Sequence, residues 1–221
     1  MIRTVIFDVD GTLLNTETIY IRAWIEAGES LGYTIPMEAL MRTRAVNRTV
    51  SKSIFQQYCG EDFDYEAVWK VRIRISEQII QSLQADALLM PHARQTLQCL
   101  KDQGFTLAAA SSTEYNATRD HLERAGIFDL FSAVLGGDMI TRGKPQPDIF
   151  LKAAELTGTE PEQCIVVGDT PADVLAGSAA GMKVVLIPDQ VPANAQTTEL
   201  SWKVLSGLDQ LPAAVKKLKA E

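Results

Sequence analysis

The chain has few of the residues that build disulfide frameworks and histidine sites. Its 221 residues include three cysteines and two histidines. Cys59, Cys99 and Cys164 are odd in number and show no paired spacing, so we expect reduced thiols in a cytoplasmic protein. His92 and His121 fall in helical stretches away from every motif below, and we interpret both as structural.

Long apolar runs and excess positive charge are also missing. No run approaches the ~18 residues that a membrane span needs, and Asp8 and Asp10 interrupt the only early apolar run, unlike a signal peptide. Lys and Arg number 21 against 28 Asp and Glu, a net charge of −7. This balance argues against nucleic acids and anionic membranes as partners. An acidic protein that binds an anionic substrate needs positively charged side chains concentrated at its binding site.

The patterns of strand and helix divide the chain into two parts. Residues 16–84 show only helical spacing, with helices expected at 16–32, after Pro36, at 50–58 and at 65–83. Elsewhere strands alternate with helices, which implies βαβ units and a parallel sheet covered on both faces. The expected strands are 4–8, 106–111, 133–136, 164–169 and 183–187, and the expected helices are 92–103, 115–124, 147–156, 171–180 and 208–218. We predict an α/β fold in which 1–15 and 85–221 form the core, 16–84 form an inserted all-helical domain, and 13–16 and 84–89 act as hinges.

The first strand leads into two acids. The apolar residues from Thr4 to Phe7 are followed by Asp8, Asp10 and Gly11, and ligands of parallel sheets bind at the carboxyl ends of strands. The two carboxylates lie on one side if the chain stays extended to Asp10, and they then repel each other without a cation or a shared proton. A simple turn would also use Asp and Gly. We favour a site for a hard cation such as Mg²⁺, with one acid left as a nucleophile or proton carrier.

Two later segments allow both a structural and a chemical interpretation. The segment Ser111-Ser112-Thr113-Glu114 opens a helix. It is either a capping box, in which Ser or Thr caps the helix and Glu114 reaches back, or a phosphate site made by hydroxyls and free N–H groups. Lys144 lies in a loop where a lysine is normally just solvated. The surrounding glycines do not have the spacing of a P-loop, and Pro145 stands where a P-loop requires Ser or Thr.

A third segment ends another apolar strand. Asp169 closes that strand, a position that helix capping does not explain. Asp173 stands three residues after Thr170, so it is either part of a helix cap or a metal ligand.

Together these segments resemble the four motifs of the haloacid dehalogenase-like superfamily, in the branch that includes β-phosphoglucomutase and phosphoglycolate phosphatase. The motifs are Asp8-Val-Asp10-Gly11-Thr12, Ser111-Ser112, Gly143-Lys144-Pro145-Gln146-Pro147-Asp148 and Gly168-Asp169-Thr170-Pro171-Ala172-Asp173. They occur in the family's order, and the resemblance covers nearly the whole chain. It implies a Rossmann-like core with a helical cap inserted after the first motif.

The resemblance also implies roles. Asp8 would be the nucleophile, Asp10 the general acid and base, and Lys144 the cation that neutralises both the nucleophile and the phosphate. The other implied ligands are Ser111 and Ser112 for phosphate, with Asp8, Asp10, Asp169 and Asp173 for Mg²⁺. In the cap, the implied substrate-binding residues are Tyr20, Arg44 and Arg48.

The predicted function is hydrolysis of a small phosphorylated metabolite by a Mg²⁺-dependent phosphatase through an aspartyl-phosphate, and we expect a monomer. The alternative is a sugar phosphomutase of the β-phosphoglucomutase type. Arg48 matches that family's loop arginine, but Tyr20 replaces its cap histidine and Ala45 replaces a glycine. A catalytically silent binding protein on the same scaffold is a third hypothesis, which the complete motif set disfavours.

Overall fold

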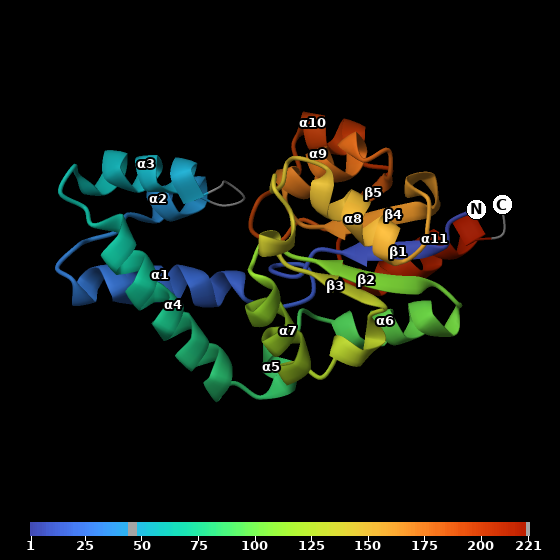
Figure 1. Cartoon of the computed structure of the whole chain (residues 1–221), viewed down its shortest axis with the longest axis horizontal. Helices are drawn as coiled ribbons and strands as arrows, with labels where there is room; N and C mark the ends of the chain where they lie inside the picture. Colours follow the sequence, from blue (N-terminus) through green and yellow to red (C-terminus); the bar gives the residue numbers. More distant parts are fainter. Residues whose placement is uncertain (44–47, 220–221) are drawn as a thin grey trace. The chain divides into compact units, whose positions relative to one another are not determined.

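The computed structural model describes residues 1–43 and 48–219 (Figure 1). The chain forms two compact units, one of Met1–Asn15 with Ala85–Glu221 and the other of Thr16–Gln84. We call the first the core and the second the cap. Arg44, one of the predicted substrate-binding residues, lies outside the described residues.

The core is built on one parallel sheet of six strands in the order β3-β2-β1-β4-β5-β6. Its strands are β1 (Thr4–Phe7), β2 (Thr106–Ala110), β3 (Ala133–Leu135), β4 (Cys164–Gly168), β5 (Lys183–Leu186) and β6 (Lys203–Val204). The first strand of the chain thus lies between β2 and β4, in the interior of the sheet. This arrangement confirms the predicted α/β, Rossmann-like fold.

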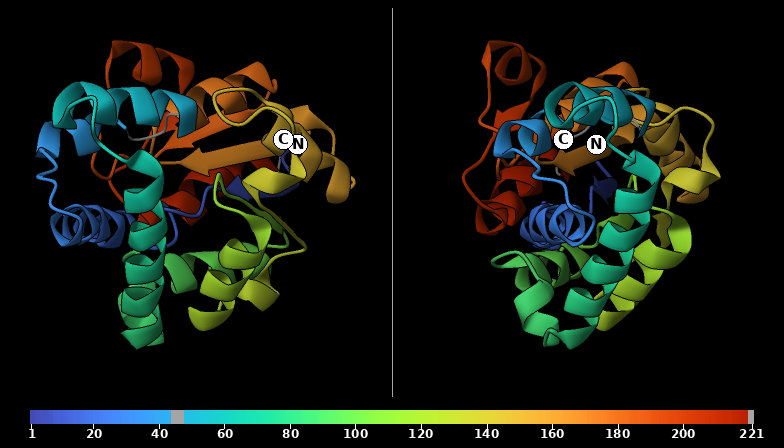
Figure 2. Two further views of the ribbon diagram at one scale, coloured as in Figure 1. Left: turned by 60° about the vertical axis from the view of Figure 1, so that its left-hand side comes forward. Right: turned by 90° about the vertical axis from the view of Figure 1, so that its left-hand side faces the viewer.

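Helices cover both faces of the sheet (Figures 1 and 2), which explains why its strands are apolar on both sides. Val5, Ile6 and Phe7 of β1 are fully buried. Ile6 belongs to a hydrophobic cluster that includes Phe150 of α8 and Val174 of α9. The core helices are α5 (Ala85–Leu88), α6 (Ala93–Asp102), α7 (Tyr115–Arg124), α8 (Asp148–Leu156), α9 (Pro171–Ala179), α10 (Ala195–Leu200) and α11 (Leu211–Lys219).

Three short elements of the core were not predicted. The segment expected to be a hinge contains α5, and α10 and β6 follow the last strong strand pattern. Asn194 caps α10 by accepting a hydrogen bond from the Thr197 N–H, so a local polar contact rather than periodicity defines this helix. β6 has two residues, both exposed, too few for alternation to reveal a strand. The 3₁₀ turns are η1 (Phe128–Leu130), η2 (Gly137–Met139), η3 (Pro161–Gln163) and η4 (Leu208–Gln210).

The described part of the cap contains helices only. They are α1 (Glu17–Ser30), α2 (Met37–Arg42), α3 (Arg48–Cys59) and α4 (Tyr65–Ser82). An aromatic cluster joins α1, α3 and the turn between α3 and α4: the ring of Phe55 stacks on Trp24 at 4.3 Å and on Phe63 at 5.5 Å between centroids. Such ring pairs stabilise a small domain beyond their buried area.

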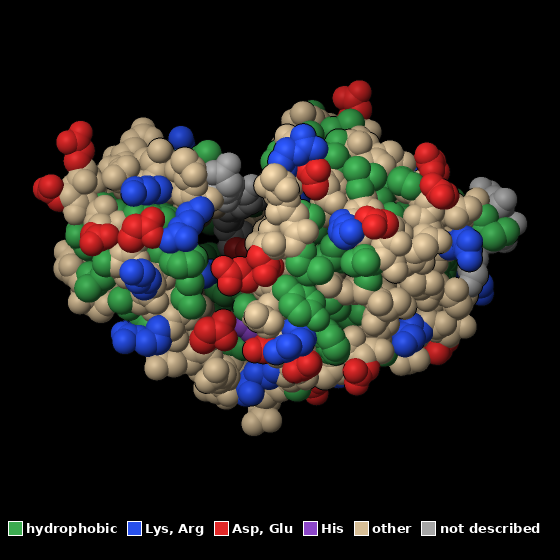
Figure 3. Space-filling view, in the orientation of Figure 1, with side chains coloured by type: hydrophobic (Ala, Val, Ile, Leu, Met, Phe, Trp, Pro, Cys, Tyr) green, Lys and Arg blue, Asp and Glu red, His purple; other side chains and the backbone are tan. Residues whose placement is uncertain are grey.

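One face of the molecule carries charges of both signs. On the face shown in Figure 3, Lys and Arg side chains are interspersed with Asp and Glu side chains. Among the described residues, no helix combines the length and the apolar character that crossing a bilayer requires.

Candidate active site

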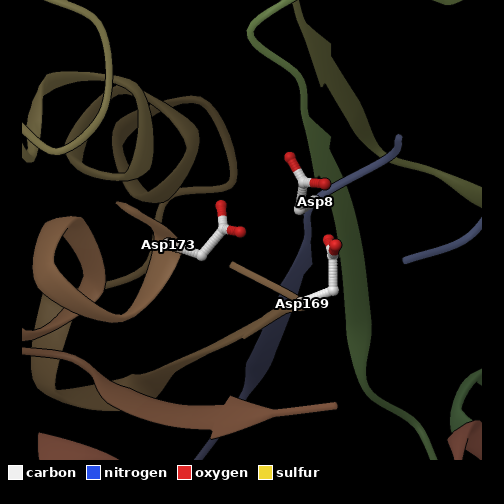
Figure 4. A group of neighbouring side chains, drawn as sticks. All are labelled: Asp8, Asp169 and Asp173. Carbon is white, nitrogen blue, oxygen red and sulfur yellow. The ribbon is translucent and has the colours of Figure 1, made fainter. Parts of the chain in front are cut away.

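Three buried carboxylates of the core converge at one end of the sheet. Asp8, Asp169 and Asp173 each place a carboxylate oxygen within 4.8 Å of the other two. Figure 4 shows the three side chains near one another, and they are at most 6% exposed. We call these residues the acid cluster.

The parallel sheet brings the acid cluster together. Asp8 follows β1 and Asp169 follows β4, and these strands are neighbours, so both acids emerge at the same edge. The Asp8 N–H donates to the Val167 carbonyl at 2.8 Å and continues the pairing one residue beyond β1. Asp173 comes from the first turn of α9, the helix that follows β4.

Two glycines leave room for the acid cluster. Gly11 has φ +84°, and a Cβ there would lie 2.6 Å from Asp169 Oδ2. A Cβ on Gly168 would lie 2.5 Å from the Cβ of Asp173. Both positions therefore need glycine for steric reasons, and Gly11 needs it for its backbone conformation as well.

Lys144 supplies the local positive charge that the acidic composition calls for. Its ammonium forms an ion pair with Asp8, lies 2.8 Å from Asp173 Oδ1 and donates to the Ala110 carbonyl at 3.0 Å. The side chain is 5% exposed, so it is not the solvated loop lysine of the alternative interpretation. Its two acidic partners raise the Lys144 pKa against the effect of burial, and the ammonium stays charged.

The acid cluster carries more negative charge than Lys144 can balance. With all three carboxylates ionised, the acid cluster and Lys144 together carry a net charge of −2, which a divalent cation would neutralise. Burial raises the pKa of the Asp8 carboxyl, Lys144 opposes this rise, and the charges of Asp173 and Asp10 add to it. Buried oxygen ligands with this charge suit a hard cation such as Mg²⁺.

Asp173 acts as a helix cap and as a member of the acid cluster. Its Oδ2 accepts from the Thr170 N–H at 3.1 Å and from the Thr170 hydroxyl at 2.5 Å, which completes a capping box. Its Oδ1 faces Lys144. The two predicted roles are thus compatible, because each uses a different oxygen.

Asp10 lies outside the acid cluster. β1 ends at Phe7, and Asp10 forms an isolated bridge with Leu14. The Asp10 Oδ2 instead accepts from the hydroxyls of Ser111 at 2.9 Å and Thr113 at 3.0 Å. Its role as a metal ligand stays a prediction.

The capping-box interpretation of the start of α7 is wrong. Glu114 itself occupies the N-cap position, without a side-chain cap bond. The first helical N–H, that of Tyr115, donates to Asp138 Oδ1 at 2.7 Å. Ser111 and Ser112 are thereby left out of the cap, with the Ser111 hydroxyl directed to Asp10.

Sequence reasoning missed two contacts, that of Thr12 with Asp169 and that of Asp138 with the start of α7. The Thr12 hydroxyl donates to Asp169 Oδ1 at 2.9 Å in a buried position, and so orients one acid of the cluster. The only sequence signals were the place of Thr12 in the first motif and the Gly136-Gly137-Asp138 string after a short strand.

The two cap candidates that the structure describes, Tyr20 and Arg48, have partners within the cap. The Arg72 guanidinium lies 4.1 Å from the ring centroid of Tyr20. Arg48 pairs with Glu66 and lies 3.8 Å from the ring centroid of Trp69. Each candidate is therefore part of a cation–π contact rather than a bare surface side chain.

Comparisons with known proteins agree with this geometry. A family model described as haloacid dehalogenase-like hydrolase matches residues 2–181. The "Probable phosphatase IndB" of Dickeya dadantii is 34% identical, with 82% of this chain and 79% of the relative covered. A β-phosphoglucomutase of Bacillus subtilis is 28% identical over 92% and 93% of the two chains. A hydrolase structure from Deinococcus radiodurans with bound phosphate and sodium has a TM-score of 0.77 at 25% identity, covering 99% of this chain and 96% of that one.

Proposed function

The chain belongs to the haloacid dehalogenase-like hydrolase family, and we propose that it is a Mg²⁺-dependent phosphatase that hydrolyses a small phosphomonoester through an aspartyl-phosphate on Asp8. The observation that carries this proposal is the ion pair of buried Asp8 with Lys144 inside the acid cluster. A buried nucleophile next to a fixed cation suits attack on a phosphate group.

Asp8, Asp169 and Asp173 would hold the metal ion. When bound, Mg²⁺ supplies positive charge opposite the oxygens of the transferring phosphoryl group. Lys144 adds a second positive charge from the chain itself. In the proposed phosphate site, the Ser111 hydroxyl and the Ser112 N–H donate hydrogen bonds to the same phosphate oxygens.

In the proposed reaction, Asp8 and Asp10 carry out two chemical steps. In the first, an Asp8 oxygen forms a bond to phosphorus as the bond from phosphorus to the ester oxygen breaks, and Asp10 gives its proton to that leaving oxygen. In the second, Asp10 takes a proton from water, which attacks phosphorus. Phosphate leaves, and Asp8 and the protonated Asp10 are restored.

The phosphomutase remains the second candidate because of the β-phosphoglucomutase relative. A panel of phosphoglycolate, sugar phosphates and nucleotides tests both, with phosphate release and sugar-phosphate isomers measured together. We expect phosphate release from at least one small phosphomonoester. Conversion of a hexose 1-phosphate to its 6-phosphate without phosphate release would replace the phosphatase by the mutase.

Mg²⁺ affinity should increase with pH. Burial raises the pKa of Asp8, so a proton competes with the metal ion for this carboxylate. We expect affinity to rise by up to about tenfold per pH unit below that pKa, with uptake of Mg²⁺ releasing up to about one proton. Calorimetry between pH 5.5 and 8 in buffers of different ionisation enthalpy measures both quantities. Constant affinity without proton release would contradict a metal site that includes Asp8.

Arg48→Ala should raise KM for the best substrate of the panel several-fold. Arginine can bond phosphate or sugar oxygens with its planar fork, and Arg48 is held by Glu66 and Trp69. The effect should be much smaller for p-nitrophenyl phosphate, because the phosphate site of the core is unchanged.

Arg42→Ala is a matched control for this prediction. Arg42 also pairs with a carboxylate, that of Glu38, and also lies over a ring, that of Tyr58. Its loss therefore removes similar contacts from the cap. Equal KM changes for Arg42→Ala and Arg48→Ala would assign Arg48 to the stability of the cap.

A further inference from the structure

Asp10, Ser111 and Thr113 form a closed set of hydrogen bonds in the core. Both hydroxyls donate to the same oxygen of Asp10, Oδ2, at 2.9 Å from Ser111 and 3.0 Å from Thr113. The Thr113 N–H in turn donates to the Ser111 hydroxyl oxygen at 2.9 Å. Two donors on one carboxylate oxygen fix the direction of that carboxylate.

The Ser111 hydroxyl has one proton, and two acceptors compete for it. A serine hydroxyl donates one hydrogen bond at a time, and here it donates to Asp10. In the proposed phosphate site the same hydroxyl donates to a phosphate oxygen. When phosphate binds, the Ser111 hydroxyl must therefore break its hydrogen bond to Asp10. The Thr113 hydroxyl keeps its hydrogen bond to Asp10 Oδ2.

We infer that Thr113 is a positioning residue for Asp10: its hydroxyl holds the Asp10 carboxylate in place while Ser111 serves the phosphate. This inference rests on the proposed function, in which Asp10 passes protons to the leaving oxygen and from water. It assigns separate tasks to two adjacent hydroxyls, with Ser111 directed to substrate and Thr113 directed to the acid.

The backbone around Thr113 is fixed tightly enough for this task. The Gly137 N–H donates to the Thr113 carbonyl at 2.8 Å, and the buried Thr118 hydroxyl donates to the same carbonyl at 3.3 Å. A Cβ on Gly137 would lie 2.4 Å from the Ser112 carbonyl oxygen, so the two loops are in close contact. These contacts therefore hold the backbone of Thr113 in place.

The experiment compares Thr113→Val, which removes the hydroxyl at nearly constant volume, with Thr113→Ser, which retains it. A misplaced catalytic group costs up to about 10²-fold in rate. We expect Thr113→Val to lower kcat by about tenfold to a hundredfold. KM and the inhibition constant of inorganic phosphate should stay within about twofold. Thr113→Ser should restore most of the rate.

Three results would overturn the inference. One is an unchanged kcat in Thr113→Val. Another is an equal loss in Thr113→Ser, because the hydroxyl would then not matter. The third is a rise in KM and in the inhibition constant of phosphate with kcat retained, which would make Thr113 a ligand of phosphate.

A double-mutant cycle with Asp10→Asn separates this inference from the proposed function. If Thr113 acts through Asp10, Thr113→Val should lower kcat little further in the Asp10→Asn background. An additional loss of the full size would contradict a positioning role. Asp10→Asn with wild-type turnover would remove Asp10 from the mechanism, whereas inactive Asp10→Asn with fully active Thr113→Val would overturn the role of Thr113 alone.

Discussion

Asp8→Asn is expected to lower kcat by about four orders of magnitude or more, the scale of loss seen when a catalytic nucleophile is removed. The substitution exchanges the nucleophilic oxygen for an amide at nearly constant volume. It also removes one buried negative charge from the acid cluster, so the protein should still fold. Steady-state turnover on the best substrate, together with thermal unfolding, measures both effects.

Asp102→Asn is the matched control. Asp102 is an exposed residue at the end of α6 that accepts a hydrogen bond from Gln98, and it lies outside the acid cluster. The same chemical change there should leave kcat within twofold of the wild type, as expected for a surface position. Turnover of Asp8→Asn within tenfold of wild type would show that Asp8 is not the nucleophile.

Lys144→Met should cause the second large loss, in activity and in stability without metal. The ammonium faces Asp8 and Asp173 from a buried position, where its charge is poorly screened. Removing such a donor typically lowers kcat by about 10²–10³-fold. Breaking a buried ion pair costs about 3–5 kcal/mol of folding free energy, because the partner carboxylates stay buried.

The stability effect should depend on metal. In the presence of a chelator Lys144→Met should unfold at a clearly lower temperature than the wild type, and excess Mg²⁺ should reduce the difference by binding the same acids. Lys152→Met is the control, since Lys152 pairs with Glu155 on α8 and the pair is partly exposed. Equal unfolding temperatures for both variants in chelator would contradict a supporting role of Lys144 in the acid cluster.

Strand ends are the part of the site that the sequence predicts well. The apolar runs before Asp8 and Asp169 indicate buried parallel strands, and such strands end at a common edge. That reasoning places two of the three acids without any knowledge of contacts. The sequence alone does not place Asp173 in the acid cluster, because helix capping already explains an acid at this position.

Contacts between distant loops are the part that sequence patterns do not reveal. Thr12 contacts Asp169, and Asp138 reaches Tyr115 across separate segments. Hydroxyl and carboxylate residues occur in many turns, so neither periodicity nor local spacing identifies such a partner. The contact of Thr113 with Asp10 was not predicted for the same reason, although Thr113 stands two residues from Ser111.

The interior place of β1 has a consequence for synthesis on the ribosome. Thr4 pairs with Thr106 on one side and with Cys164 on the other, so this strand cannot complete its hydrogen bonds until most of the chain has been made. The cap residues 16–84 are contiguous and are complete much earlier. Closure of long loops slows such non-local pairing, and an apolar strand that waits for its partners is exposed to aggregation. We expect the cap to fold first on the nascent chain and chaperones to contact residues 1–15 during the interval.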